Sequence, residues 1–408
     1  MTPDNSQPYT RRLSGLERYS LVINEVYRYN IDAIAEGSGN ISRDELQAAM
    51  AVAAEANPGV RVRLKSFLGF SKWVDSGIAP VIREVEAPEW DCYSERGSEF
   101  MQEGFHPLEG GPVCDGFLLQ GTPVRIIFRG LHAAMDARGS QHFAKDIFRV
   151  LRGEVPIGSH STLTDLDVTS KFKDRIKDVP PPAVCLPVLP PSSGNFEKLR
   201  YVWRRAIVNK NDRNMLPKMA VFLARHARKE NQTSQPDQAD EVKVGFTIPV
   251  DLRGLREDVA TTANMTGYMR IYVAPEDTPR AIMQQINQNV RNHVDCALPG
   301  ILRLLQWVPL SYMIKKMRQG IDQALYQTNK GLPSGGIVSM GMFKPEDFSC
   351  PQFKALTCVG IPGSVGKMNV VIMNYTDHIE VVFSTPEAFN MEGQLDRMID
   401  EFGAFMSA

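Results

Sequence analysis

The stretch that decides the fold is Val124 to Gly139, which reads VRIIFRGLHAAMDARG. Its first part, up to Leu131, is a run of β-branched and apolar residues that predicts a strand. The strand delivers His132 into a turn, and Asp136 follows four residues later. We expect Ser140 to cap a helix behind the turn, because apolar residues recur after it at helical spacing: Phe143, Ile147, Val150 and Leu151. A lone imidazole is thereby predicted at a strand end, with a carboxylate close behind it.

The composition narrows the class of protein. The chain has 408 residues, of which 43% are hydrophobic and 23% charged, as in globular proteins large enough for two lobes. The 46 basic and 47 acidic residues give a net charge of -1, which argues against nucleic acid or an anionic membrane as the main partner. The first residues are polar and do not resemble a secretory signal, and the six cysteines form no CxxC pair. We therefore expect reduced thiols and a cytoplasmic location.

The most apolar long segment runs from Gly300 to Ile314 and is interrupted by polar residues and a proline. It is too short and too broken to span a bilayer. We interpret the apolar stripe from Leu302 to Met317 as core or tunnel wall rather than as a membrane-binding face.

One segment divides the chain. Residues 178–194, DVPPPAVCLPVLPPSSG, contain six prolines, which continue neither a helix nor a central strand. We interpret this segment as an extended crossover between an N-terminal lobe, 1–177, and a C-terminal lobe, 195–408.

Strands and helices are interspersed in both predicted lobes, which predicts an α/β or α+β class. In the first lobe, Ser42 and Glu45 form a capping box for a helix that ends before Asn57. The second lobe is predicted to contain several elements: helices at 196–207 and 215–227, a strand at 242–250 running into Asp251-Leu252-Arg253, a hairpin of 368–375 with 379–384, and a final helix from about 386.

The motif H-A-A-M-D-A-R-G resembles the HxxxD motif of the chloramphenicol-acetyltransferase-like superfamily, which includes condensation domains and polyketide-associated acyltransferases. The order of elements is similar across most of the chain, from Leu13-Ser-Gly-Leu-Glu-Arg18 to the final hairpin and helix. The resemblance implies two lobes of one α/β fold, each a mixed sheet with helices, and a tunnel between them that exposes His132. The chain departs from the common HHxxxDG pattern at Leu131 and Ala137, and it lacks the DFGWG motif of the plant enzymes.

The resemblance also implies roles for individual residues. A neutral imidazole suits proton abstraction near pH 7, and His132 is the predicted general base. Asp136 has a structural role in the superfamily, where it pairs with an arginine of the other lobe, and Arg253 matches that arginine by position. Gly139 is predicted to support the turn. The oxyanion donor stays open between Ser339, in the segment Ser339-Met340-Gly341, and the backbone N–H groups around Gly336.

The predicted function is that of a stand-alone, monomeric acyltransferase of secondary metabolism. It would move an acyl group from a coenzyme A or carrier-protein thioester to a hydroxyl or amine, without a further cofactor or a metal. Three alternatives stay open: a catalytically silent docking module, a cyclising enzyme on the same fold, and a metal site formed by His132, Asp136 and His142. The segment Gly360 to Lys367 imitates a phosphate-binding loop but has the wrong spacing, and we predict a loop before a strand.

Overall fold

Strand β7 (Val124–Leu131) forms where the sequence predicts it and is the central strand of a five-stranded mixed sheet. Its residues are almost all buried, because both faces of the strand are covered. The sheet has the order β12-β2-β7-β6-β5, with bounds β12 (Phe353–Ile361), β2 (Asn30–Gly39), β6 (Cys114–Leu119) and β5 (Ile82–Glu84). The computed structural model describes residues 8–67, 70–87, 89–191, 200–209, 212, 214–234, 242–298, 300–305, 307–322, 332–362, 366–390 and 392–407.

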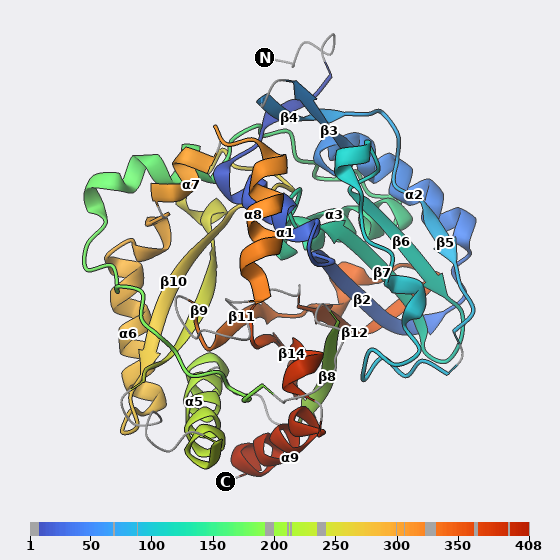
Figure 1. Cartoon of the computed structure of the whole chain (residues 1–408). Helices are drawn as coiled ribbons and strands as arrows, with labels where there is room; N and C mark the ends of the chain where they lie inside the picture. The colour runs from blue at the N-terminus through green and yellow to red at the C-terminus, as the bar shows by residue number, and fades with distance from the viewer. Residues whose placement is uncertain are drawn as a thin grey trace.

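A second, six-stranded mixed sheet lies beside the first (Figure 1). Its order is β10-β9-β11-β13-β14-β8, with bounds β10 (Thr266–Val273), β9 (Val244–Asp251), β11 (Gly335–Met342), β13 (Asn369–Asn374), β14 (Ile379–Pro386) and β8 (Tyr201–Val208). The predicted hairpin is present as β13 and β14, which pair antiparallel. A small sheet of β1 (Thr10–Arg12), β4 (Phe70–Asp75) and β3 (Val62–Phe67) completes the strands of the described part.

Each large sheet has its own helices. Helices α2 (Arg43–Ala56) and α3 (Ala137–Leu151) share a core with β2 and β7, whereas α5 (Met215–Ser234), α6 (Pro279–Arg291) and α9 (Gln394–Ser407) share one with the second sheet. Helix α1 (Gly15–Asn24) contacts α7 (Gly300–Leu305) and α8 (Leu310–Asp322), and α8 runs in front of the junction of the sheets (Figure 1). A short helix, α4 (Asp165–Thr169), precedes the proline-rich segment. The mixed α/β class and the two-lobed arrangement agree with the prediction.

The two sheets are interleaved along the chain. Strand β12 comes late in the sequence, yet it pairs antiparallel with β2 from Phe353 to Ile361. A cut at 178–194 therefore does not separate the two hydrogen-bonded sheets, because residues assigned to the predicted C-terminal lobe complete the sheet of the N-terminal one. The described part of the crossover, 178–191, is irregular, and Leu186, Val188 and Leu189 are buried in the core of the second sheet.

The predicted helix over 196–207 is wrong in its described part, because residues 201–208 form strand β8. This edge strand pairs with β14 from Tyr201 to Val208, and its aromatic and β-branched residues suit a pleated surface. Residues 196–199 lie outside the described residues. No described helix is both long enough and apolar enough to cross a membrane.

Candidate active site

His132 lies in the turn between β7 and α3, where the sequence places it. The backbone N–H of His132 donates to the carbonyl oxygen of Tyr29 at 3.0 Å, and the N–H groups of Ala134 and Met135 donate to the carbonyl of Leu131 at 2.8 and 3.1 Å. These bonds hold the turn to the end of β7 and to the segment that precedes β2. His132 is partly buried as a whole residue.

Asp136 ends the turn and caps α3. Its carboxylate accepts from the backbone N–H of Gly139 at 2.7 Å, so α3 begins at Ala137. The predicted cap at Ser140 is therefore wrong. Aspartate is as good a cap as serine and lies closer to the strand, so the helix starts one turn earlier than its apolar spacing suggests.

The predicted ion pair between Asp136 and Arg253 is present. The guanidinium donates to both carboxylate oxygens of Asp136 at 3.0 Å, in the two-pronged arrangement that suits arginine and carboxylate. Asp136 also accepts from the backbone N–H of Met265 at 2.7 Å and from the hydroxyl of Thr266 at 3.3 Å. Burial of the carboxyl opposes its ionisation, yet Arg253 and these N–H donors outweigh burial and hold the pKa of Asp136 below its ordinary value.

The connection from β9 to β10 reaches across to the His132 turn. Besides Asp136, Arg253 donates to the carbonyl oxygens of Thr261 at 3.1 Å and Ala263 at 2.7 Å, so the arginine also shapes its own loop. A Cβ atom on Gly139 would lie 2.1 Å from the carbonyl oxygen of Thr262. Only glycine permits this approach, which gives the predicted supporting residue a steric reason.

Two side chains that the sequence analysis did not select contact His132. The ring of Tyr29 stacks on the imidazole with centroids 4.5 Å apart and an interplanar angle of 18°. The side-chain amide nitrogen of Asn264 donates to the carbonyl oxygen of His132 at 2.9 Å and lies 3.3 Å from Nδ1. No motif marks either residue, because each meets the histidine only through folding of distant segments.

The electrostatics favour a neutral imidazole. Burial lowers the pKa of His132, and the hydrogen bond of the ring to its own backbone and the charge of Asp136 offset this only in part. A neutral ring has a nitrogen lone pair that accepts a proton. The site can thus hold a base at neutral pH in a fixed orientation.

The two candidate oxyanion donors differ in whether they are already hydrogen-bonded within the sheet. The backbone N–H of Gly336 donates to the carbonyl oxygen of Met368 at 2.9 Å, so this N–H belongs to the sheet and is not available to a substrate. Ser339 is exposed on β11, and its role stays a prediction. Gly341, at the end of the same strand, lies beside Arg138, since a Cβ atom there would be 3.5 Å from the guanidinium.

The alternative metal site is not assembled. The Nε2 atom of His142 contacts the carbonyl oxygen of Gly158 at 3.0 Å, whereas Asp136 is occupied by Arg253 and by backbone N–H groups. Among the described residues, the one cluster with several metal-ligand types is His293, Asp295 and Cys296, all on one turn that follows α6.

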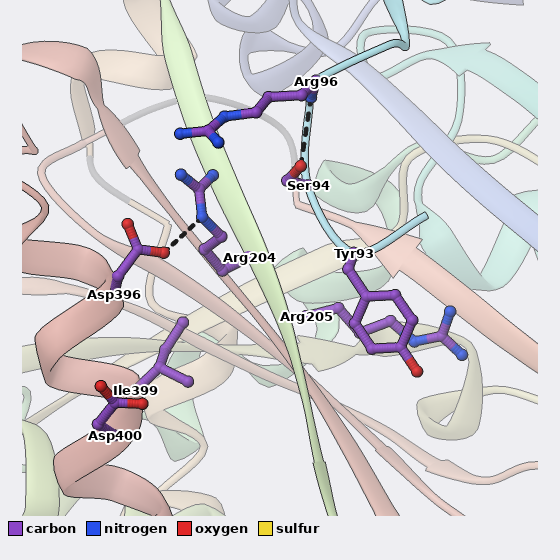
Figure 2. A pocket seen from close by; sticks show the side chains of 8 residues that line it. All are labelled: Tyr93, Ser94, Arg96, Arg204, Arg205, Asp396, Ile399 and Asp400. Carbon is purple, nitrogen blue, oxygen red and sulfur yellow. Dashed lines mark hydrogen bonds and ion pairs between the residues drawn. The ribbon is translucent and has the colours of Figure 1, made fainter. Parts of the chain in front are cut away.

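A cavity of about 380 Å³ lies elsewhere in the molecule, against the outer strand β8 and helix α9 (Figure 2). Arg96 and Arg204 point into it from one side and Asp396 from another, and Arg204 donates to Asp396 at 2.7 Å. Its lining includes neither His132 nor Asp136. This cavity therefore does not form part of the candidate active site.

Comparison with known proteins identifies the fold. No protein-family model matches the chain, and no curated protein matches it. A variant of the starter condensation domain of rhizomide synthetase RzmA, in complex with C8-CoA and Leu-SNAC, is 13% identical with a TM-score of 0.66, and the match covers 98% of this chain and 95% of that one. The first condensation domain of the CDA synthetase is 14% identical with a TM-score of 0.65, covering 97% and 95%. The chain thus has the fold of condensation domains. Condensation domains are among the proteins whose HxxxD motif this sequence resembles.

Proposed function

We propose that the protein is an acyltransferase that moves an acyl group from a thioester to a hydroxyl or amine, with His132 as the general base. The observation that carries this proposal is the support of His132 from both parts of the chain. Tyr29, which precedes His132 in the chain, stacks on the ring. Asn264 and Arg253, which lie more than 100 residues after it, contact the turn. A general base must be held in a fixed orientation and must be uncharged. The contacts with Tyr29 and Asn264 support the first requirement, and the lowered pKa of His132 supports the second.

The chemistry follows from these groups. The imidazole takes the proton from the attacking O–H or N–H while the oxygen or nitrogen bonds to the thioester carbon. The tetrahedral intermediate then collapses, the carbon–sulfur bond breaks, and the thiolate leaves with the proton that His132 returns. Asp136 faces Arg253 and takes no proton, so we assign it to positioning.

The donor is proposed as a coenzyme A or carrier-protein thioester, because one structural neighbour is a complex with C8-CoA. We also propose that the enzyme is a monomer that acts in secondary metabolism in the cytoplasm. The first experiment incubates the protein with a panel of acyl thioesters and alcohols or amines, and follows the products by mass spectrometry.

The decisive variant is His132→Ala, assayed by single-turnover transfer to a hydroxyl acceptor. An alcohol is a poor nucleophile until it is deprotonated, so we expect turnover to fall by about 10²–10⁴-fold, the usual contribution of one positioned base. Donor binding should change little. His142→Ala is the matched control, because this histidine lies on α3 and contacts Gly158 instead of the turn.

A loss below about tenfold in a folded His132→Ala protein would remove this residue from the mechanism. If the wild type transfers no acyl group but retains thioester binding, the silent docking module becomes the better hypothesis.

A further inference from the structure

The segment that contains α7 and α8 is unlike the rest of the chain in charge. From Gly300 to Asp322 it contains four basic residues and one acidic residue, Asp322 at its end, although the whole chain has a net charge of -1. The balanced overall composition thus conceals a local excess of positive charge. Three of its cations, Lys315, Lys316 and Arg318, are exposed on α8.

The inner side of this segment is fixed to α1. Leu302 and Met313 are buried, and a Cβ atom on Gly15 would lie 1.8 Å from the carbonyl oxygen of Leu302. Arg18 donates from Nε to the carbonyl oxygen of Leu305 at 3.1 Å and from Nη2 to that of Val308 at 2.6 Å. The segment is therefore held against α1 by hydrogen bonds to its backbone and by close packing.

The inner side also adjoins the candidate active site. Met317 of α8 packs in one apolar cluster with Tyr27 and Tyr29, and Tyr29 stacks on His132. In Figure 1, α8 runs in front of the junction between the sheets. Helix α8 is thus connected to the histidine through one apolar cluster and one aromatic stack.

The outer side exposes large apolar side chains. Leu304 is 62% exposed, Trp307 68% and Tyr312 54%. The ammonium of Lys316 lies 5.9 Å from the ring centre of Tyr312. Arg318 instead donates to the carbonyl oxygen of Glu25, which follows α1, at 3.0 Å, so its guanidinium faces the body of the molecule. We call five residues the α7–α8 surface: Leu304, Trp307, Tyr312, Lys315 and Lys316. Exposed aromatic groups beside cations match a partner that is both apolar and negatively charged.

The stripe from Leu302 to Met317, expected to be core or tunnel wall, is buried at Leu302 and Met313 but exposed at Leu304 and Tyr312. Contrary to that expectation, we propose that the α7–α8 surface docks on an anionic lipid membrane. Tryptophan and tyrosine are enriched where lipid headgroups meet hydrocarbon, and lysine stems extend their charges to the phosphates. Protein interfaces, in contrast, are depleted of lysine, and both cations of this surface are lysines. The occupant that the chemistry favours is therefore a lipid surface rather than an acidic protein. Docking would hold the His132 side of the molecule at the membrane.

The test is co-sedimentation of the full chain with vesicles of phosphatidylcholine alone or with 30 mol% phosphatidylglycerol added, a composition of about one anionic lipid in three. We expect binding to the anionic vesicles that weakens as salt is raised, and little binding to the neutral ones. Lys315→Gln with Lys316→Gln should weaken binding by about fivefold per lysine. Leu304→Ser with Trp307→Ser should weaken it by about tenfold or more, because the inserted apolar area is lost.

Matched controls use residues away from this surface. Lys65→Gln with Lys72→Gln removes two exposed lysines that face each other across β3 and β4, and Ile157→Ser removes a side chain that is 68% exposed. Both controls should bind vesicles like the wild type. Circular dichroism of every variant checks that it is folded.

Equal sedimentation of the wild type with and without anionic vesicles would overturn the proposal, and so would binding that the α7–α8 variants leave unchanged. If the protein ignores vesicles but binds a purified acidic carrier protein, and the same variants abolish that binding, the surface docks a protein and the lipid assignment is wrong. Vesicle binding needs no substrate, so this outcome is independent of the proposed acyl transfer.

Discussion

Two arginine–carboxylate clusters join the parts of this molecule, and they differ in what they hold. At the candidate site, Arg253 binds Asp136 in the turn after β7. Between the sheets, Arg205 of β8 donates to Glu380 of β14 at 2.9 and 3.1 Å and also binds Glu36 of β2. The first cluster connects two loops, whereas the second connects two sheets.

The surroundings of the two clusters show the consequence. Asp136 is surrounded by backbone N–H donors, and Arg253 by backbone carbonyls, so that cluster fixes the path of two loops in detail. The side chain of Arg205 is 3% exposed and its neighbours are side chains, among them the hydroxyl of Thr357 at 3.2 Å. Burial of the guanidinium opposes its charge, but Glu380 and Glu36 outweigh burial and raise the pKa of Arg205 above its ordinary value. We infer that the Asp136–Arg253 cluster positions the loops of the candidate site, whereas the Arg205 cluster stabilises the contact between the two sheets.

The largest expected effect is on stability, in the cluster between the sheets. Arg205→Met would leave Glu380 and Glu36 buried with fewer opposite charges, and we expect the free energy of unfolding to fall by about 3–5 kcal/mol. Chemical denaturation followed by circular dichroism measures it. Arg43→Met is the control, because its pair with Asp44 is largely exposed and should contribute little. Equal losses in the two variants would refute the assigned role of Arg205.

Asp136→Asn should affect turnover more than stability. The amide can still cap α3 in part, and Arg253 keeps two carbonyl partners and Asp251, so the loss of stability should be smaller, about 1.5–3 kcal/mol. Turnover should nevertheless fall, because the turn that carries His132 loses its anchor. Asp251→Asn, at the exposed partner of the same arginine, should change both quantities much less. Normal turnover in Asp136→Asn would show that the pair does not position the histidine.

The sign of the pH dependence follows from the lowered pKa of Asp136. Its ionised form is stabilised in the folded state, so the contribution is complete above the ordinary aspartate pKa and is lost as the pH falls through the lower folded value. The stability difference between wild type and Asp136→Asn should therefore be constant from neutral pH downward and shrink only below about pH 4. A difference that shrinks already near neutral pH would contradict this assignment.

The comparison also separates what the sequence can reveal from what it cannot. The His132 turn is local, and its strand, histidine and aspartate follow one another within thirteen residues, Val124 to Asp136. The partner Arg253 came from a resemblance, since 117 residues separate it from Asp136. The cap was misplaced because aspartate and serine cap helices equally well, and apolar spacing does not identify the first turn.

Strand pairing was the harder part. Residues 201–207 were predicted as helix, because an apolar stretch with two arginines fits either period, and only pairing with β14 decides for the strand. Strand β12 was not predicted to join β2, since nothing local marks a partner more than 300 residues away. Tyr29 and Asn264 were missed for the same reason, because their contacts with His132 exist only in the folded chain.

The smallest expected effect concerns the way in which Asn264 acts on the imidazole. Its amide nitrogen lies 3.3 Å from Nδ1 of His132 and carries no charge. Asn264→Asp would place a carboxylate at that distance, which favours the protonated ring and should raise the pKa of His132 by about one unit or more. Only neutral histidine accepts a proton, so the acid limb of the rate profile should move to higher pH, while the rate well above the pKa should change little.

The measurement needs no substrate, because the pKa of His132 can be followed by NMR of the imidazole protons. The His132 signal is identified by its absence in His132→Ala. In the wild type, burial should place the midpoint below the ordinary value of about 6.5, and in Asn264→Asp the midpoint should lie above that of the wild type. Asn264→Leu has similar volume but neither charge nor hydrogen bond, so it reports the effect of lost positioning alone and should leave the midpoint low. If Asn264→Asp titrates like Asn264→Leu, the side chain does not face the ring, and the contribution of this loop to the site is confined to Arg253 and the backbone around it.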